Sequence, residues 1–88
     1  MTEETRDNRI KRLSMRSMRR GIKEMDVILS RYAGLRLADM DDAELDGYDA
    51  LLVENDQDLY QWVTGQVPPP AQHAGLVDDI KRVACVPK

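Results

Sequence analysis

Apolar residues recur three and four positions apart through most of the chain, and this spacing constrains the fold more than any other feature. Side chains at such positions share one face of an α-helix, whereas a strand would alternate apolar and polar residues. No sustained alternation of that kind occurs in the sequence. We therefore predict an all-α protein folded as a compact five-helix bundle.

The chain has 88 residues, which is enough for one domain. We assign residues 1–88 to that single domain, with the helical bundle over about residues 8–84 and a proline-rich connector at 66–71. Three consecutive prolines in the connector exclude a continuing helix there. A domain of this size buries only roughly 60–65% of the surface that its unfolded chain exposes, so we expect a thin core.

Two helices are expected in the first half of the chain. Asp7 or Asn8 can cap a helix that ends near Arg19, and Gly21 interrupts before a second helix over about 22–35. The inward face of the first helix is expected to carry Ile10, Leu13, Ser14 and Ser17. That of the second is expected to carry Met25, Ile28, Leu29 and Tyr32.

The third helix has the clearest start signal. Asp41 is expected as N-cap with Glu44 as its capping-box partner, while Met40 and Leu45 have the spacing of a hydrophobic staple. Its predicted buried face consists of Leu45, Tyr48, Leu51 and Leu52.

Two shorter patterns follow. Asp56 is expected to cap a fourth helix that Gly65 closes, and a fifth helix is expected over about 72–84. The inward-facing residues are expected to be Leu59, Trp62, Val63, Leu76, Ile80 and Val83. We assign Trp62 to the core rather than to a stacking surface for a ligand.

Charge is unevenly distributed along the chain. Residues 1–24 hold eight basic and four acidic side chains, whereas residues 25–88 hold five basic and twelve acidic ones. A basic stripe is predicted on the first helix, formed by Arg9, Arg12, Arg16, Arg19 and Arg20. Nine carboxylates and no basic residue lie from Asp39 to Asp58, and we interpret them as a solvated acidic face that would repel phosphates. Nucleic-acid binding is therefore not expected of the whole domain. Because the first helix is basic and could attract polyanions, nucleic-acid binding through this helix is the alternative function.

No constellation for catalysis or metal binding is recognisable. The five glycines are scattered singly and form no phosphate-binding loop, and the acidic segment lacks the ligand spacing of an EF-hand. The chain contains one histidine, His73, which we expect to be an exposed loop or helix-start residue, and one cysteine, Cys85. We predict no enzymatic activity, no bound cofactor and no metal.

Localisation signals are few. No apolar run approaches the roughly 18 residues of a membrane span, so we expect no membrane insertion. Glu3, Glu4 and Asp7 interrupt an otherwise Arg-rich start, unlike a mitochondrial transit peptide, and we interpret the start as mature sequence. The lone Cys85 fits a reducing cytoplasm, which is the predicted location.

The segment Arg20-Gly21-Ile22-Lys23-Glu24 has two interpretations. In the first, its residues only end one helix and begin the next, with the arginine at a C-terminal dipole, the glycine as a left-handed stop and the glutamate in a first turn. In the second, Gly21 is a bare stretch of backbone ringed by charge, which a partner can approach closely. The candidate partner-binding residues are Arg16, Arg19, Arg20, Gly21 and Glu24.

The order of several motifs resembles the SdhE family of succinate dehydrogenase assembly factors. The Arg-Gly-x-x-Glu segment is followed by Met25-Asp26, by Glu44-Leu45-x-x-Tyr48-x-x-Leu51-Leu52 and by Asp56-x-Asp58-Leu59-x-x-Trp62-Val63-x-Gly65. The resemblance covers about residues 9–65. It departs from the family pattern at Tyr48, where Phe is usual, and after Gly65.

The resemblance implies a five-helix bundle and a function as an assembly factor. Family members bind the flavoprotein subunit of succinate dehydrogenase, and often of fumarate reductase, and promote covalent attachment of FAD to it. The residues that match the family's contact motif are Arg20, Gly21 and Glu24. Because no flavin cradle is recognisable, we expect the protein to orient its client rather than to deliver FAD. We expect a monomer, and lone apolar surface residues leave dimerisation open.

Overall fold

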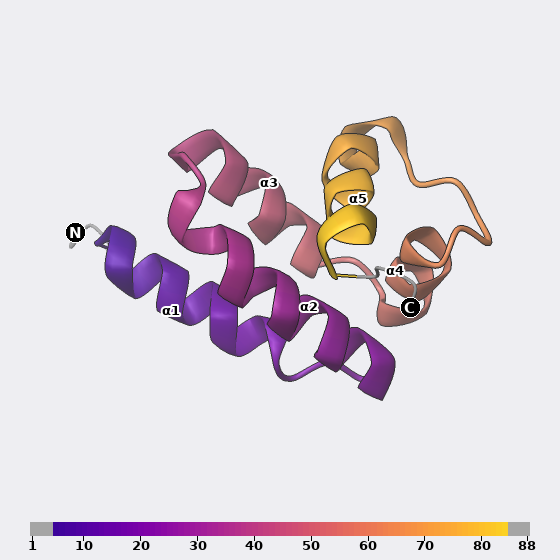
Figure 1. Cartoon of the computed structure of the whole chain (residues 1–88), viewed down its shortest axis with the longest axis horizontal. Helices are drawn as coiled ribbons and strands as arrows, with labels where there is room; N and C mark the ends of the chain where they lie inside the picture. Colours follow the sequence, from indigo (N-terminus) through magenta and orange to yellow (C-terminus); the bar gives the residue numbers. More distant parts are fainter. Residues whose placement is uncertain (1–4, 85–88) are drawn as a thin grey trace.

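The computed structural model describes residues 5–84, which form five α-helices and one 3-10 turn. The elements are α1 (Arg6–Ser17), α2 (Lys23–Arg36), η1 (Leu37–Asp39), α3 (Asp42–Leu52), α4 (Asp56–Val63) and α5 (Ala71–Ala84) (Figure 1). Within that range no residue is in a strand, which confirms the all-α prediction. Cys85 lies outside the described residues, so the reducing cytoplasm inferred from this lone cysteine stays a prediction.

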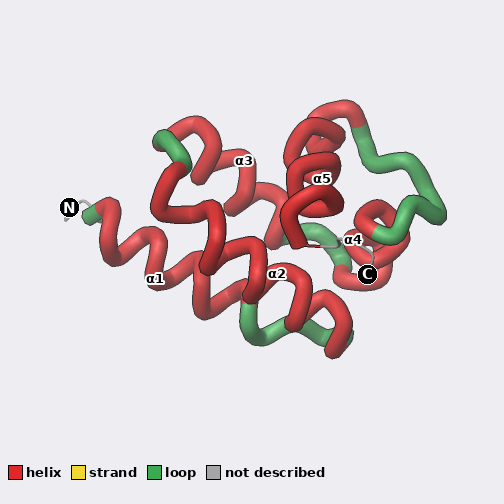
Figure 2. Tube along the Cα trace, in the orientation of Figure 1, coloured by secondary structure: helices red, strands yellow, loops and turns green. Residues whose placement is uncertain are grey.

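The first two helices form an antiparallel hairpin along one side of the molecule (Figure 1). Helix α5 packs mainly against α2 and α4, and α3 lies against both α1 and α5. Figure 2 shows the loop that joins α4 to α5, which contains the three prolines at 68–70. The last helix, α5, therefore packs against α2, and it forms one wall of the groove described below.

The core is built from the apolar faces of all five helices. Most of the predicted inward residues are buried, and Trp62 is only 7% exposed. In α5 the buried apolar positions are Val77, Ile80 and Ala84, whereas Leu76 and Val83 are only partly buried. The buried face of α5 therefore lies about one residue further along the sequence than the predicted inward face.

Helix starts show where local sequence signals succeed. Asp41 accepts a hydrogen bond from the Glu44 amide at 2.8 Å, and the Glu44 carboxylate accepts one from the Asp41 amide at 3.0 Å, which confirms the capping box. Met40 and Leu45 of the predicted staple are both buried. Gly65, with a φ of 83°, follows the end of α4 in the left-handed conformation that favours glycine.

Two predicted caps were wrong. Thr5, not Asp7 or Asn8, caps α1 through a 3.1 Å bond from the Asn8 amide, and the helix ends at Ser17 rather than near Arg19. Asn55, not Asp56, caps α4 by accepting from the Gln57 amide at 2.8 Å. With Asn55 in the cap position, the Asp56 carboxylate is free to bind elsewhere.

Candidate functional site

The junction between α1 and α2, residues 18–22, is held to the rest of the molecule by Arg20. Its side chain is only 9% exposed, and its Nε donates to Asp56 Oδ1 at 2.7 Å. One terminal nitrogen also donates to the Leu52 carbonyl at 3.1 Å. Arg20 therefore connects this junction to the end of α3 and the start of α4.

The same Asp56 carboxylate binds the neighbouring glycine. Its second oxygen, Oδ2, accepts a hydrogen bond from the Gly21 backbone amide. One carboxylate thus holds the Arg20 side chain and the Gly21 main chain, and we call this arrangement the Asp56 clamp. Such bonds to an ionised acceptor are short and about twice as strong as neutral ones.

The glycine is needed for space rather than for a left-handed backbone. Gly21 has no positive φ, so its predicted role as a left-handed helix stop was wrong. A Cβ atom at this position would lie 3.1 Å from Asp56 Oδ2, which is tighter than ordinary contact. Any side chain at residue 21 would press on the Asp56 clamp.

The remaining candidate residues divide into paired and unpaired ones. Arg16 donates to Asp49 at 2.6 Å and is partly buried. Arg19 and Glu24 are exposed, and within residues 5–84 neither forms an ion pair. Arg20 and Gly21 thus both bind Asp56. Arg19, inside the junction, and Glu24, two residues after it, are exposed to solvent.

The predicted basic stripe is largely neutralised by the neighbouring helix. Arg9 pairs with Asp46, and Arg12 and Arg16 both pair with Asp49, at 3.6 and 2.6 Å. With the Arg20–Asp56 pair these contacts form a ladder along α1, which we call the arginine ladder. The interpretation of residues 39–58 as a solvated acidic face was therefore wrong for Asp49 and Asp56, which are largely covered, whereas Asp46 is paired but still mostly exposed. Sequence spacing does not reveal which helix will lie opposite.

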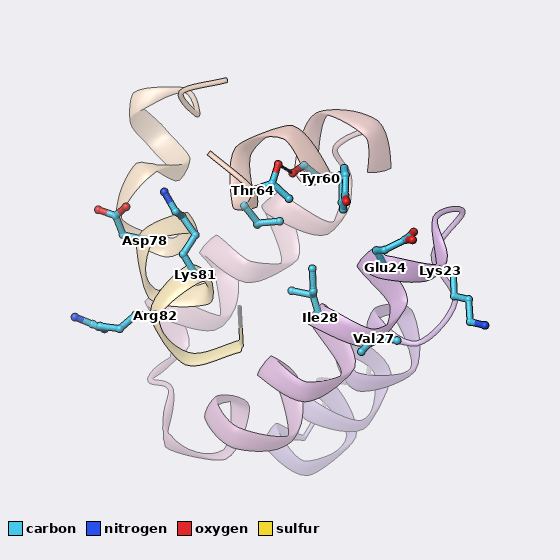
Figure 3. A pocket seen from close by; sticks show the side chains of 10 residues that line it. Lys23, Glu24, Val27, Ile28, Tyr60, Thr64, Asp78, Lys81 and Arg82 are labelled. Carbon is cyan, nitrogen blue, oxygen red and sulfur yellow. Dashed lines mark hydrogen bonds between the residues drawn. The ribbon is translucent and has the colours of Figure 1, made fainter. Parts of the chain in front are cut away.

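An open groove of about 1070 Å³ begins beside Glu24. Its walls come from three helices: Lys23, Glu24, Val27 and Ile28 of α2, Tyr60, Val63 and Thr64 at α4, and Asp78, Lys81 and Arg82 of α5. Figure 3 shows Ile28 in the middle of this space, with Tyr60 and Thr64 on one side and Lys81 on another. Sequence reasoning missed the groove because α5 joins it only through tertiary packing.

His73 lies near the Asp56 clamp and was also predicted incorrectly. It is in the first turn of α5, as expected, but is only 4% exposed. Its Nε2 is 3.0 Å from Glu54 Oε2, and its ring lies 5.8 Å from that of Trp62. The backbone carbonyl of Glu54 is itself 3.5 Å from an Arg20 nitrogen, so His73 supports the turn to which Arg20 is bound.

A partly buried polar contact joins α2 to α5. The Tyr32 hydroxyl donates to Asp79 Oδ2 at 2.6 Å, and Arg36 donates to the other oxygen at 3.2 Å. The bond from Tyr32 lowers the pKa of Asp79, while burial raises the pKa of Tyr32 above its ordinary range. This contact fixes the helix that carries Lys81.

Among residues 5–84 no group of three or more His, Cys, Asp or Glu side chains is arranged to hold a metal ion. In the same range no helix is long and apolar enough to cross a bilayer. The arrangement that the structure does provide is a rigid charged junction next to an open groove, which suits contact with another macromolecule.

Known proteins resemble the chain over most of its length. The family model described as flavinator of succinate dehydrogenase (Sdh5) matches residues 11–84. This range includes the junction between α1 and α2, the Asp56 clamp and all of α5. It continues well past residue 65, where the resemblance carried by the sequence motifs ended.

Individual relatives agree with the family model. Proteins named succinate dehydrogenase assembly factor 2, mitochondrial, are 48% identical in Meyerozyma guilliermondii over 72% of this chain and 52% identical in Yarrowia lipolytica over 70% of it. The one from Mycosarcoma maydis is 42% identical over 81% of the chain. The aligned parts are 47%, 42% and 30% of these relatives' own lengths. The names of the relatives say mitochondrial, whereas the cytoplasmic location of this chain stays a prediction.

Proposed function

The chain belongs to the Sdh5 family of succinate dehydrogenase flavinators, and from this premise we propose that it binds the flavoprotein subunit of that enzyme and promotes covalent attachment of FAD to it. The acceptor in the client is a histidine side chain, as the family resemblance implies. The related flavoprotein of fumarate reductase is proposed as a second client. In this proposal the chain is a non-enzymatic assembly factor.

The Asp56 clamp is the observation that supports this function most directly. The clamp joins a nearly buried arginine and a backbone amide of the junction to one carboxylate. Here the clamp fixes the backbone of Gly21 and so sets where Arg19 and Glu24 project. A rigid scaffold with two exposed, unpaired charges is suited to recognising one partner in one orientation.

The proposed mechanism is orientation of the client. Covalent attachment occurs between FAD and the client's own histidine, so the assembly factor needs no nucleophile of its own. By holding the flavoprotein so that its histidine faces the bound flavin, the factor can remove several kcal/mol from the barrier. The residues of this chain bind and position, and FAD supplies the reactive ring.

The nucleic-acid alternative loses support from the arginine ladder. Arg9, Arg16 and Arg20 already face carboxylates of α3 and α4, so phosphate binding by these side chains would require breaking those contacts.

Glu24→Ala tests the proposed function most cleanly. Glu24 is exposed in the first turn of α2, so its removal should lower stability by at most about 1 kcal/mol through the helix dipole. We expect calorimetric titration with the purified flavoprotein to show at least a tenfold weaker affinity, with a melting temperature close to that of the wild type.

Asp58→Ala provides the matched control. Asp58 is also an exposed acid in the first turn of a helix, α4, but it lies outside the groove and the clamp. We expect wild-type affinity from this variant. Equal affinities for the wild type, Glu24→Ala and Asp58→Ala would show that the motif is only a helix junction.

Gly21→Arg is a less direct test than Glu24→Ala. Because Gly21 has no positive φ, the substitution carries no cost of a left-handed backbone, but any Cβ at this position contacts Asp56. A loss of client binding would therefore combine a damaged clamp with a blocked surface.

A further inference from the structure

The groove between α2, α4 and α5 has an apolar floor that is open to solvent. Val27 is 53% exposed, and Ile28 and Tyr60 are only partly buried around the same space. Single exposed apolar residues are common on proteins, but here they line one concave surface formed by three helices. Figure 3 shows the side chain of Ile28 directed into this space.

Charged side chains of both signs stand on two walls of the groove, Lys23 and Glu24 on α2 and Asp78, Lys81 and Arg82 on α5. Glu24 lies on the α2 wall and Lys81 on the α5 wall (Figure 3). Over the described part of the chain neither side chain forms an ion pair, whereas Arg82 on the same wall pairs with Asp79 at 2.6 Å. Glu24 and Lys81 are therefore available to pair with charges of an occupant, as are their neighbours Lys23 and Asp78 on the same rim.

We propose that this groove seats an apolar segment of the client flavoprotein, flanked by a basic side chain that meets Glu24 and an acidic side chain that meets Lys81. The proposal rests on the function proposed above and names the surface and the chemistry that the client must present. Glu24 connects the two, because it belongs both to the Arg-Gly-x-x-Glu segment and to the rim of the groove.

The shape of the groove fits a protein segment better than a small ligand. Its volume of about 1070 Å³ is at the upper end of ligand pockets, yet it is an open trough rather than an enclosed cavity. Its charged groups are flexible side chains on the rim, and the floor consists of apolar side chains. An amphipathic chain with alternating anchors can satisfy both features at once.

Val27→Asp tests the groove without touching the core or the clamp. Val27 is already half-exposed, so an aspartate there should leave the melting temperature nearly unchanged. The proposal predicts at least a tenfold loss of affinity for the purified flavoprotein, because a carboxylate would replace an apolar anchor at the interface. Lys81→Glu should also weaken binding, with a loss that shrinks as salt is raised.

Leu35→Asp is the matched control for this experiment. Leu35 lies on the same helix, is 56% exposed and does not line the groove. Wild-type affinity in Leu35→Asp together with weak binding in Val27→Asp supports the proposal. If Glu24→Ala weakens binding while Val27→Asp does not, the groove is not the docking surface but the proposed function stands. If the wild type itself does not bind the flavoprotein, both fail.

The occupant can be identified by photo-crosslinking. A benzoylphenylalanine in place of Val27, in the full chain mixed with the flavoprotein, should crosslink to a client peptide with apolar residues beside a charged one. The same replacement at Leu35 should give little product. Crosslinking of residue 27 to a second copy of this chain, or equal yields from both positions, would overturn the proposal.

Discussion

At the scale of single residues, Asp56 has the most consequential position in the molecule. Its two oxygens hold the Arg20 guanidinium and the Gly21 amide, which are separated from it by more than thirty residues of sequence. Because Arg20 is almost fully buried, removing its partner would leave a buried charge with only carbonyl acceptors.

Asp56→Ala is therefore expected to lower the free energy of unfolding by about 1.5–3 kcal/mol, the range for hydrogen bonds to a charged group. Urea denaturation checks the loss. Client affinity should fall as well, because the junction would no longer be fixed. A loss below about 0.5 kcal/mol, equal to that of Asp58→Ala, would mean that the clamp contributes little.

Sequence alone did not reveal this role. Asp56 follows Asn55 at the start of a helix, and either residue is a good N-cap. The structure uses Asn55 for the cap. The presence of two cap candidates in succession was the available signal that one of them could have another role, but nothing local indicated Arg20 as its partner.

Tyr48 gives a prediction for alkaline pH. Burial raises the pKa of Tyr48 to about 12, against about 10 in an unfolded chain. The neutral phenol is thus favoured in the folded state, so its contribution to stability is complete below pH 10 and is lost as pH rises toward 12. Tyr48→Phe should reduce this fall, by an amount that approaches about 1.4 kcal/mol per pH unit.

Urea denaturation of the wild type and Tyr48→Phe at pH 8, 10 and 11 measures this difference. At pH 8 the variant should be less stable by about 0.5–1.5 kcal/mol, because the hydroxyl oxygens of Tyr48 and Ser17 lie 2.6 Å apart and share a buried hydrogen bond. Parallel stability curves for the two proteins would contradict the account.

At the scale of elements, α1 depends on charge as much as on burial. Of its residues only Leu13 and Ser17 are buried, whereas the arginine ladder pairs it with α3 along its length and continues past its end to Asp56 of α4. Exposed pairs of this kind each contribute little, but they fix which face of α1 meets α3. The position of the Asp56 clamp at the end of α1 follows from that register.

Asp49→Ala tests the arginine ladder at the residue that Arg12 and Arg16 share. We expect a loss of about 0.5–1 kcal/mol at low salt, which should almost vanish in 1 M NaCl, where the screening length is about 3 Å. Thermal denaturation of the wild type and the variant at both salt concentrations measures it. The same loss at both concentrations would indicate a packing effect instead.

At the scale of the whole molecule, the fold could be predicted because its determinants are local. Helical spacing, the capping box of Asp41 and Glu44, and the glycine at 65 are encoded within a few residues. The candidate site could be predicted only in part. The motif was visible, but the Asp56 clamp, the burial of His73 and the groove depend on contacts between distant segments.

The proposed function makes one central claim: the Asp56 clamp fixes a junction next to which Glu24 contacts the client flavoprotein. The most direct test is a reconstitution with purified flavoprotein lacking FAD, free FAD and equal amounts of the wild type, Glu24→Ala or Asp58→Ala. Covalent flavin is then measured by in-gel fluorescence. The account predicts strong fluorescence with the wild type and Asp58→Ala and little above background with a folded Glu24→Ala. Full fluorescence with Glu24→Ala, or none with the wild type, would contradict it.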